Sequence, residues 1–107
     1  MVKEVDIQRA IMDYLETLKR AGKLTYWRSG NYCAPNRRFN GYRGMSDLSV
    51  LLHPWGVFCG IECKTGKNRQ SKDQRAFESD ITNQGAIYIL AYELDDVIGA
   101  FKDLGVI

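Results

Sequence analysis

Residues 47–64 read DLSVLLHPWGVFCGIECK. This stretch contains two runs rich in β-branched and large apolar residues, Asp47–His53 and Val57–Lys64. Between them lie the turn-forming residues of Pro54–Gly56, so the pattern predicts two antiparallel strands joined as a hairpin.

The hairpin places three charged side chains together. Alternate side chains of a strand point to opposite faces, so Glu62 and Lys64 share a face and Cys63 lies on the other. The antiparallel register brings Asp47 opposite this end of the second strand. Two neighbouring carboxylates raise each other's proton affinity, and a divalent cation with oxygen ligands, Mg²⁺ or Mn²⁺, relieves the repulsion. On spacing alone, the alternative is a surface Glu-x-Lys beside an unrelated Asp.

The rest of the chain predicts helices and strands around this hairpin. Apolar residues at helical spacing indicate a helix from Val5 to about Arg20. The other expected elements, in chain order, are a strand at Leu24–Arg28, a loop at Ser29–Gly44, a helix from Ser71 to Gly85, a strand at Ala86–Ala91 and a helix around Leu94–Phe101. The resulting order, αβββαβα, predicts an α/β fold.

Composition limits the class of protein. With 107 residues, 45% hydrophobic and 26% charged, the chain suits one soluble domain spanning residues 1–107. No apolar run is long enough for a membrane helix, and we expect a cytoplasmic protein. The three cysteines are expected to be free thiols. The single histidine, His53, excludes two-histidine zinc fingers and HExxH metal sites.

Positive charge is concentrated in the first part of the chain. Between Thr17 and Ser46 there are seven Lys or Arg residues and no Asp or Glu, and a second basic cluster runs from Lys64 to Arg75. Arginine and lysine bind phosphates, so the pattern favours a nucleic-acid partner; a solvated basic loop is the alternative. The candidate nucleic-acid-binding residues are Arg28, Arg37, Arg38, Arg43, Lys67, Arg69 and Lys72.

Several short motifs together resemble a known family. Gly44-Met45-Ser46-Asp47 and Ile61-Glu62-Cys63-Lys64, with 14 residues between Asp47 and Glu62, are similar to the active-site motif of the PD-(D/E)XK nuclease superfamily. More narrowly, the chain resembles the stand-alone VRR-NUC (virus-type replication-repair nuclease) domain. The further matching motifs are Glu4-Val5-Asp6-Ile7-Gln8, Trp27-Arg28 and Ser71-Lys72-Asp73-Gln74.

The resemblance implies a restriction-endonuclease-like αβββαβ core, in which helices flank a mixed central sheet, with an extra C-terminal helix. It implies that Asp47, Glu62 and the Cys63 backbone carbonyl hold Mg²⁺ or Mn²⁺ and that Lys64 is catalytic. Ser46 stands where the superfamily often has proline, which puts little in doubt because that proline is not a ligand.

Two further catalytic candidates have competing interpretations. Gln74 is the N3 residue of a Ser-x-x-Gln capping box, and a capping role alone would explain a glutamine at this position. The resemblance implies instead that the Gln74 side chain lies beside Lys64. Glu4 stabilises a helix dipole if it lies in the first turn, whereas the resemblance implies a position beside the metal, even as a ligand.

The function implied by the resemblance is metal-dependent hydrolysis of DNA phosphodiester bonds. We expect an endonuclease selective for branched DNA, such as Holliday junctions or flaps in DNA repair, acting as a homodimer in a bacterial or phage-infected cell. The alternatives are a non-catalytic nucleic-acid-binding module and a nuclease subunit that needs a partner protein.

Overall fold

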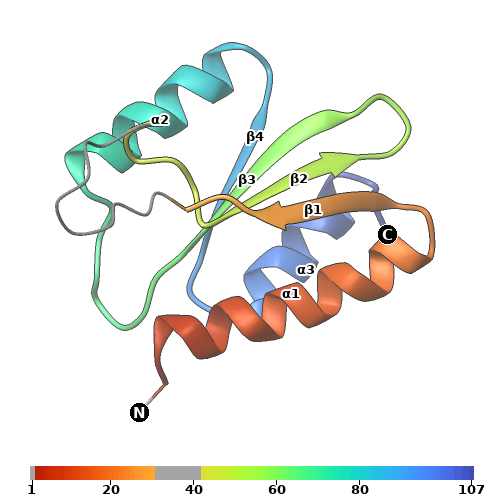
Figure 1. Cartoon of the computed structure of the whole chain (residues 1–107), viewed down its shortest axis with the longest axis horizontal. Coiled ribbons are helices and arrows are strands. Elements are labelled where there is room, and N and C mark those ends of the chain that lie inside the picture. Colours follow the sequence, from red (N-terminus) through yellow and green to blue (C-terminus); the bar gives the residue numbers. More distant parts are fainter. Residues whose placement is uncertain (1, 31–41) are drawn as a thin grey trace, which may run out of the picture.

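A computed structural model describes residues 2–30 and 42–107, which form three helices and four strands (Figure 1). The elements, in chain order, are α1 (Glu4–Arg20), β1 (Leu24–Arg28), β2 (Leu48–Leu52), β3 (Val57–Cys63), α2 (Lys72–Asn83), β4 (Ile87–Ala91) and α3 (Leu94–Asp103). The predicted order αβββαβα is confirmed, and the bounds agree within about two residues.

The four strands form one mixed sheet in the order β1-β2-β3-β4. β1 pairs antiparallel with β2, and β2 pairs antiparallel with β3, as the hairpin pattern predicted. β3 and β4 run parallel, with α2 as the connection between them. The mixed sheet implied by the resemblance is therefore confirmed.

Local sequence explains where the first two helices end or begin. After α1 the chain turns at Gly22, whose φ of 76° is accessible to glycine at little cost, and the Lys23 amide donates to the Leu18 carbonyl at 3.0 Å. The Ser71 hydroxyl caps α2 by accepting a hydrogen bond from the backbone amide of Gln74 at 3.1 Å.

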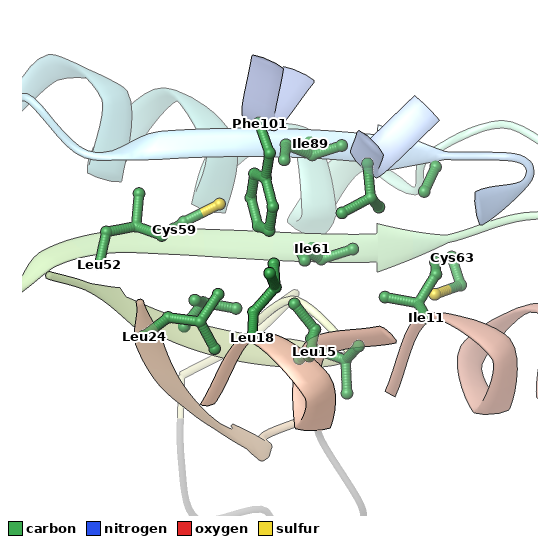
Figure 2. Packing of buried hydrophobic residues seen from close by; sticks show 14 of the residues in the cluster. Ile11, Leu15, Leu18, Leu24, Leu52, Cys59, Ile61, Cys63, Ile89 and Phe101 are labelled. Carbon is green, nitrogen blue, oxygen red and sulfur yellow. The ribbon is translucent and has the colours of Figure 1, made fainter. Parts of the chain in front are cut away.

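α1 and α3 cover one face of the sheet and form the apolar core with it (Figures 1 and 2). The helical spacing of α1 places Ile7, Ile11, Leu15 and Leu18 on its buried face. The other core residues are Leu24, Leu48, Val50, Leu52, Cys59, Ile61, Cys63, Ile89, Ala91, Val97 and Phe101.

α2 covers the opposite face, where the packing is more polar (Figure 1). Its buried anchor is Phe77, which contacts the Tyr88 ring of β4 at a centroid distance of 6.3 Å. Polar residues are buried in the parts of β2, β3 and their flanks that the structure describes: Ser46, Ser49 and Glu62. This face therefore carries the polar groups from which a site can be built.

Cys59 and Cys63 are free and buried, and burial raises the pKa of each thiol to about 12. Cys33 lies outside the described residues.

Among the described helices, none has the length and apolar character needed to cross a membrane.

Candidate active site

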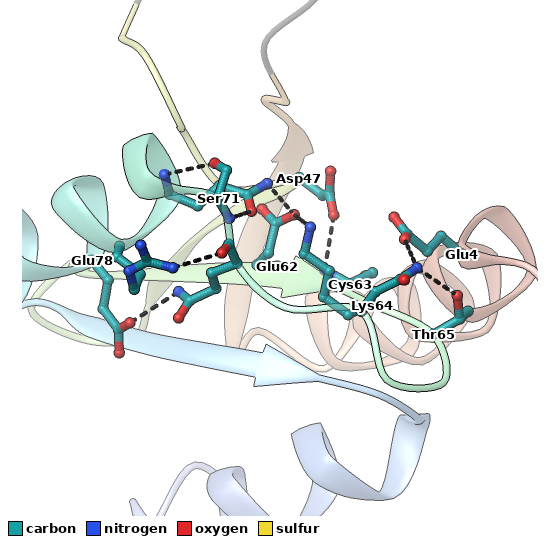
Figure 3. A network of polar contacts seen from close by, with 12 residues as sticks. Glu4, Asp47, Glu62, Cys63, Lys64, Thr65, Ser71 and Glu78 are labelled. Carbon is teal, nitrogen blue, oxygen red and sulfur yellow. Dashed lines mark hydrogen bonds and ion pairs between the residues drawn. The ribbon is translucent and has the colours of Figure 1, made fainter.

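The Asp47 and Glu62 side chains meet at the end of the β2–β3 hairpin. Leu48 pairs with Ile61, so Asp47, one residue earlier, lies opposite Glu62 on the face covered by α2. The Cys63 amide donates to Asp47 Oδ2 at 2.8 Å, which ties the Asp47 carboxylate to β3 (Figure 3). The convergence predicted from the hairpin register is thus observed.

Glu62 is buried, with 3% of its surface exposed. Its Oε2 accepts from Gln74 Nε2 at 2.9 Å and lies 3.9 Å from Lys64 Nζ. Its Oε1 is buried and has no hydrogen-bond partner among the described residues. Such an oxygen is costly unless something binds it, so this site favours a ligand that accepts electron pairs.

The two carboxyl groups are electrostatically linked. Burial raises the pKa of Glu62 to about 8, and the negative charge of Asp47 adds to the shift. Burial also raises the pKa of Asp47, against the hydrogen bond from the Cys63 amide, which lowers it. Desolvation is thus the largest cause in both cases. The charge of Asp47 raises the pKa of Glu62 as the sequence predicted, whereas the Glu62 side chain lowers the pKa of Asp47 through a hydrogen bond, so the expected mutual rise is found for Glu62 alone. A cation at this position would favour the ionised form of both groups.

The donor set fits a hard divalent cation only in part. Mg²⁺ typically uses one or two carboxylates and keeps several waters, which suits Asp47 and Glu62 with the unpartnered Oε1. Across residues 2–30 and 42–107, no three His, Cys, Asp or Glu side chains form a group that could hold a metal ion. Any cation would therefore depend on these two carboxylates, backbone carbonyls and water.

A polar pocket of about 290 Å³ opens beside Asp47. One wall is the start of α2 with Ser71, Asp73 and Gln74, and the other is formed by Gly30 and by the segment from Arg43 to Met45. A phosphate group placed in this pocket would lie next to Asp47.

The chain is similar to a solved structure titled "VRR_NUC domain", with a TM-score of 0.66 and 19% sequence identity, over 95% of this chain and 97% of that one. This chain has the fold of a VRR_NUC domain. No protein-family profile matches the sequence, and no curated protein matches it.

Within this VRR_NUC fold, Gln74 makes the predicted helix cap and also contacts Glu62, the residue that lies beside Lys64. Gln74 Oε1 accepts from the Ser71 amide at 2.8 Å, which is the capping interaction. Gln74 Nε2 donates to Glu62 at the same time. The helix cap thus orients the amide toward the carboxylate pair.

Glu4 lies in the first turn of α1 and also near Asp47 and Lys64 (Figure 3). Asn68 Nδ2 donates to Glu4 Oε2 at 3.4 Å, and the charge of Glu4 contributes to the raised pKa of Asp47. Glu4 does not form a metal-binding group with Asp47 and Glu62. Both roles considered for it, in the dipole and beside the site, remain compatible with this position.

The basic candidates separate into two places. Arg43 lines the pocket, and Lys67, Arg69 and Lys72 are exposed on the segment from the end of β3 to the start of α2. Arg28 pairs with Leu48 and lines a pocket with α1, so it lies on the face of the sheet opposite Asp47 and Glu62. Arg37 and Arg38 lie outside the described residues.

Several residues that support Asp47 were not identified from the sequence. The Ser29 and Gly30 amides donate to the Asp47 carbonyl at 2.8 and 3.1 Å, and Ser29 Oγ donates to the Ser46 carbonyl at 3.0 Å. A Cβ on Gly60 would lie 2.7 Å from Ser46 Oγ, so this glycine lets the segment before β2 pack onto β3. A glycine inside a strand often marks a place where another backbone segment comes close, so Gly60 was the sequence feature that indicated this contact.

Gly44 has a similar explanation. A Cβ at this position would lie 2.1 Å from the Asp73 carbonyl oxygen, and its φ is 73°. The first residue of the Gly-x-x-Asp motif is thus needed for backbone contact with α2, which puts Asp47 and Gln74 on facing walls of one pocket.

Proposed function

We propose that this chain is a nuclease that hydrolyses phosphodiester bonds of DNA with a divalent metal ion. The observation that carries the proposal is the pairing of half-buried Asp47 with buried Glu62, with an unpartnered Glu62 Oε1 and Lys64 Nζ beside it. Two carboxylates and a lysine, with one carboxylate lining a polar pocket of about 290 Å³, are groups that phosphodiester hydrolysis uses. The VRR_NUC fold supports the same assignment.

Asp47, Glu62 and the Cys63 carbonyl would hold the metal, with Glu4 at the edge of the site. When bound, Mg²⁺ or Mn²⁺ supplies positive charge that activates water and neutralises charge developing on the phosphate. Lys64 orients or deprotonates the attacking water and stabilises the pentacovalent oxyanion. Gln74 keeps Glu62 directed toward the site through its 2.9 Å hydrogen bond.

The basic side chains would bind the DNA backbone. Arg43 lines the pocket beside Asp47, and Lys67, Arg69 and Lys72 are exposed on the segment that connects Lys64 with Gln74, so phosphates that they bind would lead a strand past Asp47 and Glu62. Such contacts do not depend on base sequence and weaken with salt. Arg28, on the other face, and Arg37 and Arg38 remain candidates for contacts with a second part of the substrate.

The finer assignments belong to the same proposal. The substrate is branched DNA, a Holliday junction or a flap, because contacts to phosphates alone distinguish DNA by its shape. The enzyme acts as a homodimer, which supplies two centres for two strands. Its location is the cytoplasm of a bacterial or phage-infected cell.

The test is cleavage of labelled four-way junction, flap and linear duplex DNA by the purified chain with Mg²⁺, Mn²⁺ or EDTA. Lys64→Met, which keeps the buried stem of the side chain, should abolish cleavage and retain DNA binding. The matched control is Lys102→Met on α3, which is exposed and should leave cleavage unchanged. Binding without cutting under every metal would replace the proposal with a binding module or a subunit that needs a partner.

A further inference from the structure

Residues Tyr42–Met45, which contact α2 and include three residues of the pocket wall, form a tight turn. The Met45 amide donates to the Tyr42 carbonyl at 3.2 Å, and Gly44 has the positive φ that such a turn uses at its third position. Arg43 and Gly44 are its two central residues, and both line the pocket beside Asp47. The position of this turn therefore fixes the Cα position of Arg43 at the pocket.

Tyr42 attaches this turn to α2 by two contacts. Its hydroxyl donates to Asp80 Oδ2, and its ring meets the Phe77 ring edge-on at a centroid distance of 4.9 Å. Phe77 is buried, whereas 47% of Tyr42 is exposed. Tyr42 is thus not a core residue; what holds it is the contact with one ring and one carboxylate.

A third contact attaches the turn to the first residues of α2. The Gly44 backbone packs directly against Asp73 and Gln74. Residues 73, 77 and 80 follow one another at helical spacing, so the turn lies along one face of α2. α2 also carries Gln74, but the position of that side chain is fixed independently by Ser71 and Glu62.

We propose that Tyr42 is a positioning residue that fixes the turn on α2 and thereby holds Arg43 at the pocket for a DNA phosphate. This inference rests on the proposed nuclease function. Tyr42 acts through Arg43 and does not touch the reacting atoms. Its loss should weaken substrate binding and leave the chemical step, which depends on Asp47, Glu62 and Lys64, almost unchanged.

The experiment compares Tyr42→Phe with Tyr26→Phe. Tyr42→Phe keeps the ring contact and removes the hydroxyl that donates to Asp80. Tyr26→Phe removes an equivalent bond, from the Tyr26 hydroxyl to Glu16 Oε1 at 2.8 Å, on the face covered by α1. DNA affinity is measured by fluorescence anisotropy in Lys64→Met, and KM and kcat by cleavage of the preferred DNA with Mn²⁺ in the active chain.

For Tyr42→Phe we expect a Kd and a KM on the order of tenfold higher, as loss of a hydrogen bond to a carboxylate predicts, and a kcat within about twofold. Tyr26→Phe should leave all three unchanged. Asp80→Ala should match Tyr42→Phe, and Asp80→Asn, which keeps an oxygen acceptor, should recover much of the affinity.

A double-mutant cycle tests whether the effect passes through Arg43. In an Arg43→Ala background, Tyr42→Phe should weaken binding no further. Additive losses, an unchanged affinity in Tyr42→Phe, or a fall in kcat alone would overturn the assignment.

The two proposals fail in different ways. A wild-type chain that binds DNA but never cuts it contradicts the nuclease, while the anisotropy series still decides the role of Tyr42. A wild-type chain that binds no DNA overturns both.

Discussion

The two faces of the sheet use the same strands but have different environments. On the face covered by α1 and α3, β3 contributes Cys59, Ile61 and Cys63 to an aliphatic core. On the face covered by α2, the intervening residues Gly60 and Glu62 meet a serine, a glutamine and a second carboxylate. Because side chains alternate along a strand, one seven-residue segment contributes both to the core and to the candidate site.

The difference shows how a small domain can carry a destabilised site. Burying an incompletely partnered carboxyl group has a free-energy cost, and the apolar face must offset it. Truncating the aliphatic core should therefore destabilise the protein, whereas replacing the incompletely partnered carboxyl group should stabilise it.

Ile61→Ala should have the largest effect on stability. Ile61 is fully buried in the core, and deleting such a side chain typically lowers the free energy of unfolding by about 2–5 kcal/mol. Urea denaturation followed by circular dichroism measures the loss. A change below about 1 kcal/mol would mean that the α1–α3 face is not the principal source of stability.

Gly60→Ala, one residue away, should destabilise through steric overlap instead. The new Cβ would lie 2.7 Å from the buried Ser46 Oγ, so we expect a loss of about 1–3 kcal/mol. Adding Ser46→Gly, which removes that side chain, should recover part of the loss in the same denaturation assay. If the double variant is less stable by the sum of the two single losses, the contact is not the cause.

Glu62→Gln should change stability in the other direction. The amide oxygen can keep the contact with Gln74, and the amide NH2 replaces the unpartnered carboxyl oxygen with a donor that Asp47 can accept, so the metal-free protein in EDTA should gain about 1 kcal/mol. Mn²⁺ at 100 times its Kd should stabilise the wild type by about 2.7 kcal/mol and the variant far less.

Glu78→Gln is the matched control for Glu62→Gln. Glu78 lies on the same helix as Gln74 but is bonded to Gln70, away from the carboxylate pair, so this variant should keep the full Mn²⁺ response. Thermal unfolding with and without Mn²⁺ measures both variants. An undiminished response in Glu62→Gln would remove Glu62 from the metal ligands.

Much of the fold was predictable because its determinants are local. The helical spacing of Ile7, Ile11 and Leu15 defines α1, and the Ser71–Gln74 cap defines the start of α2. The position of the hairpin turn fixed the register, and with it the meeting of Asp47 and Glu62, because the side-chain period of two leaves little freedom.

The parts that were not predictable depend on contacts between distant segments. Tyr42 and Asp80 are 38 residues apart, and no periodicity relates them. The face occupied by Arg28 follows from its pairing with Leu48, which requires the β1–β2 register in addition to the alternation within β1. Gly44 matched the family motif, but its reason, contact with the Asp73 carbonyl, appears only when α2 is in place.

The smallest expected effect concerns the other buried oxygen without a partner. In the described part of the chain, the Tyr14 hydroxyl on α1 shares this property with Glu62 Oε1, and burial raises its pKa. Tyr14→Phe keeps the ring near Phe101 and should raise the free energy of unfolding by about 0.5–1 kcal/mol, without altering cleavage or the Mn²⁺ response. If Tyr14→Phe instead weakens Mn²⁺ binding, the separation of the two faces is wrong. If it stabilises the protein and leaves the Mn²⁺ response intact, an unpartnered buried oxygen is functional only where a second carboxylate and a lysine stand beside it.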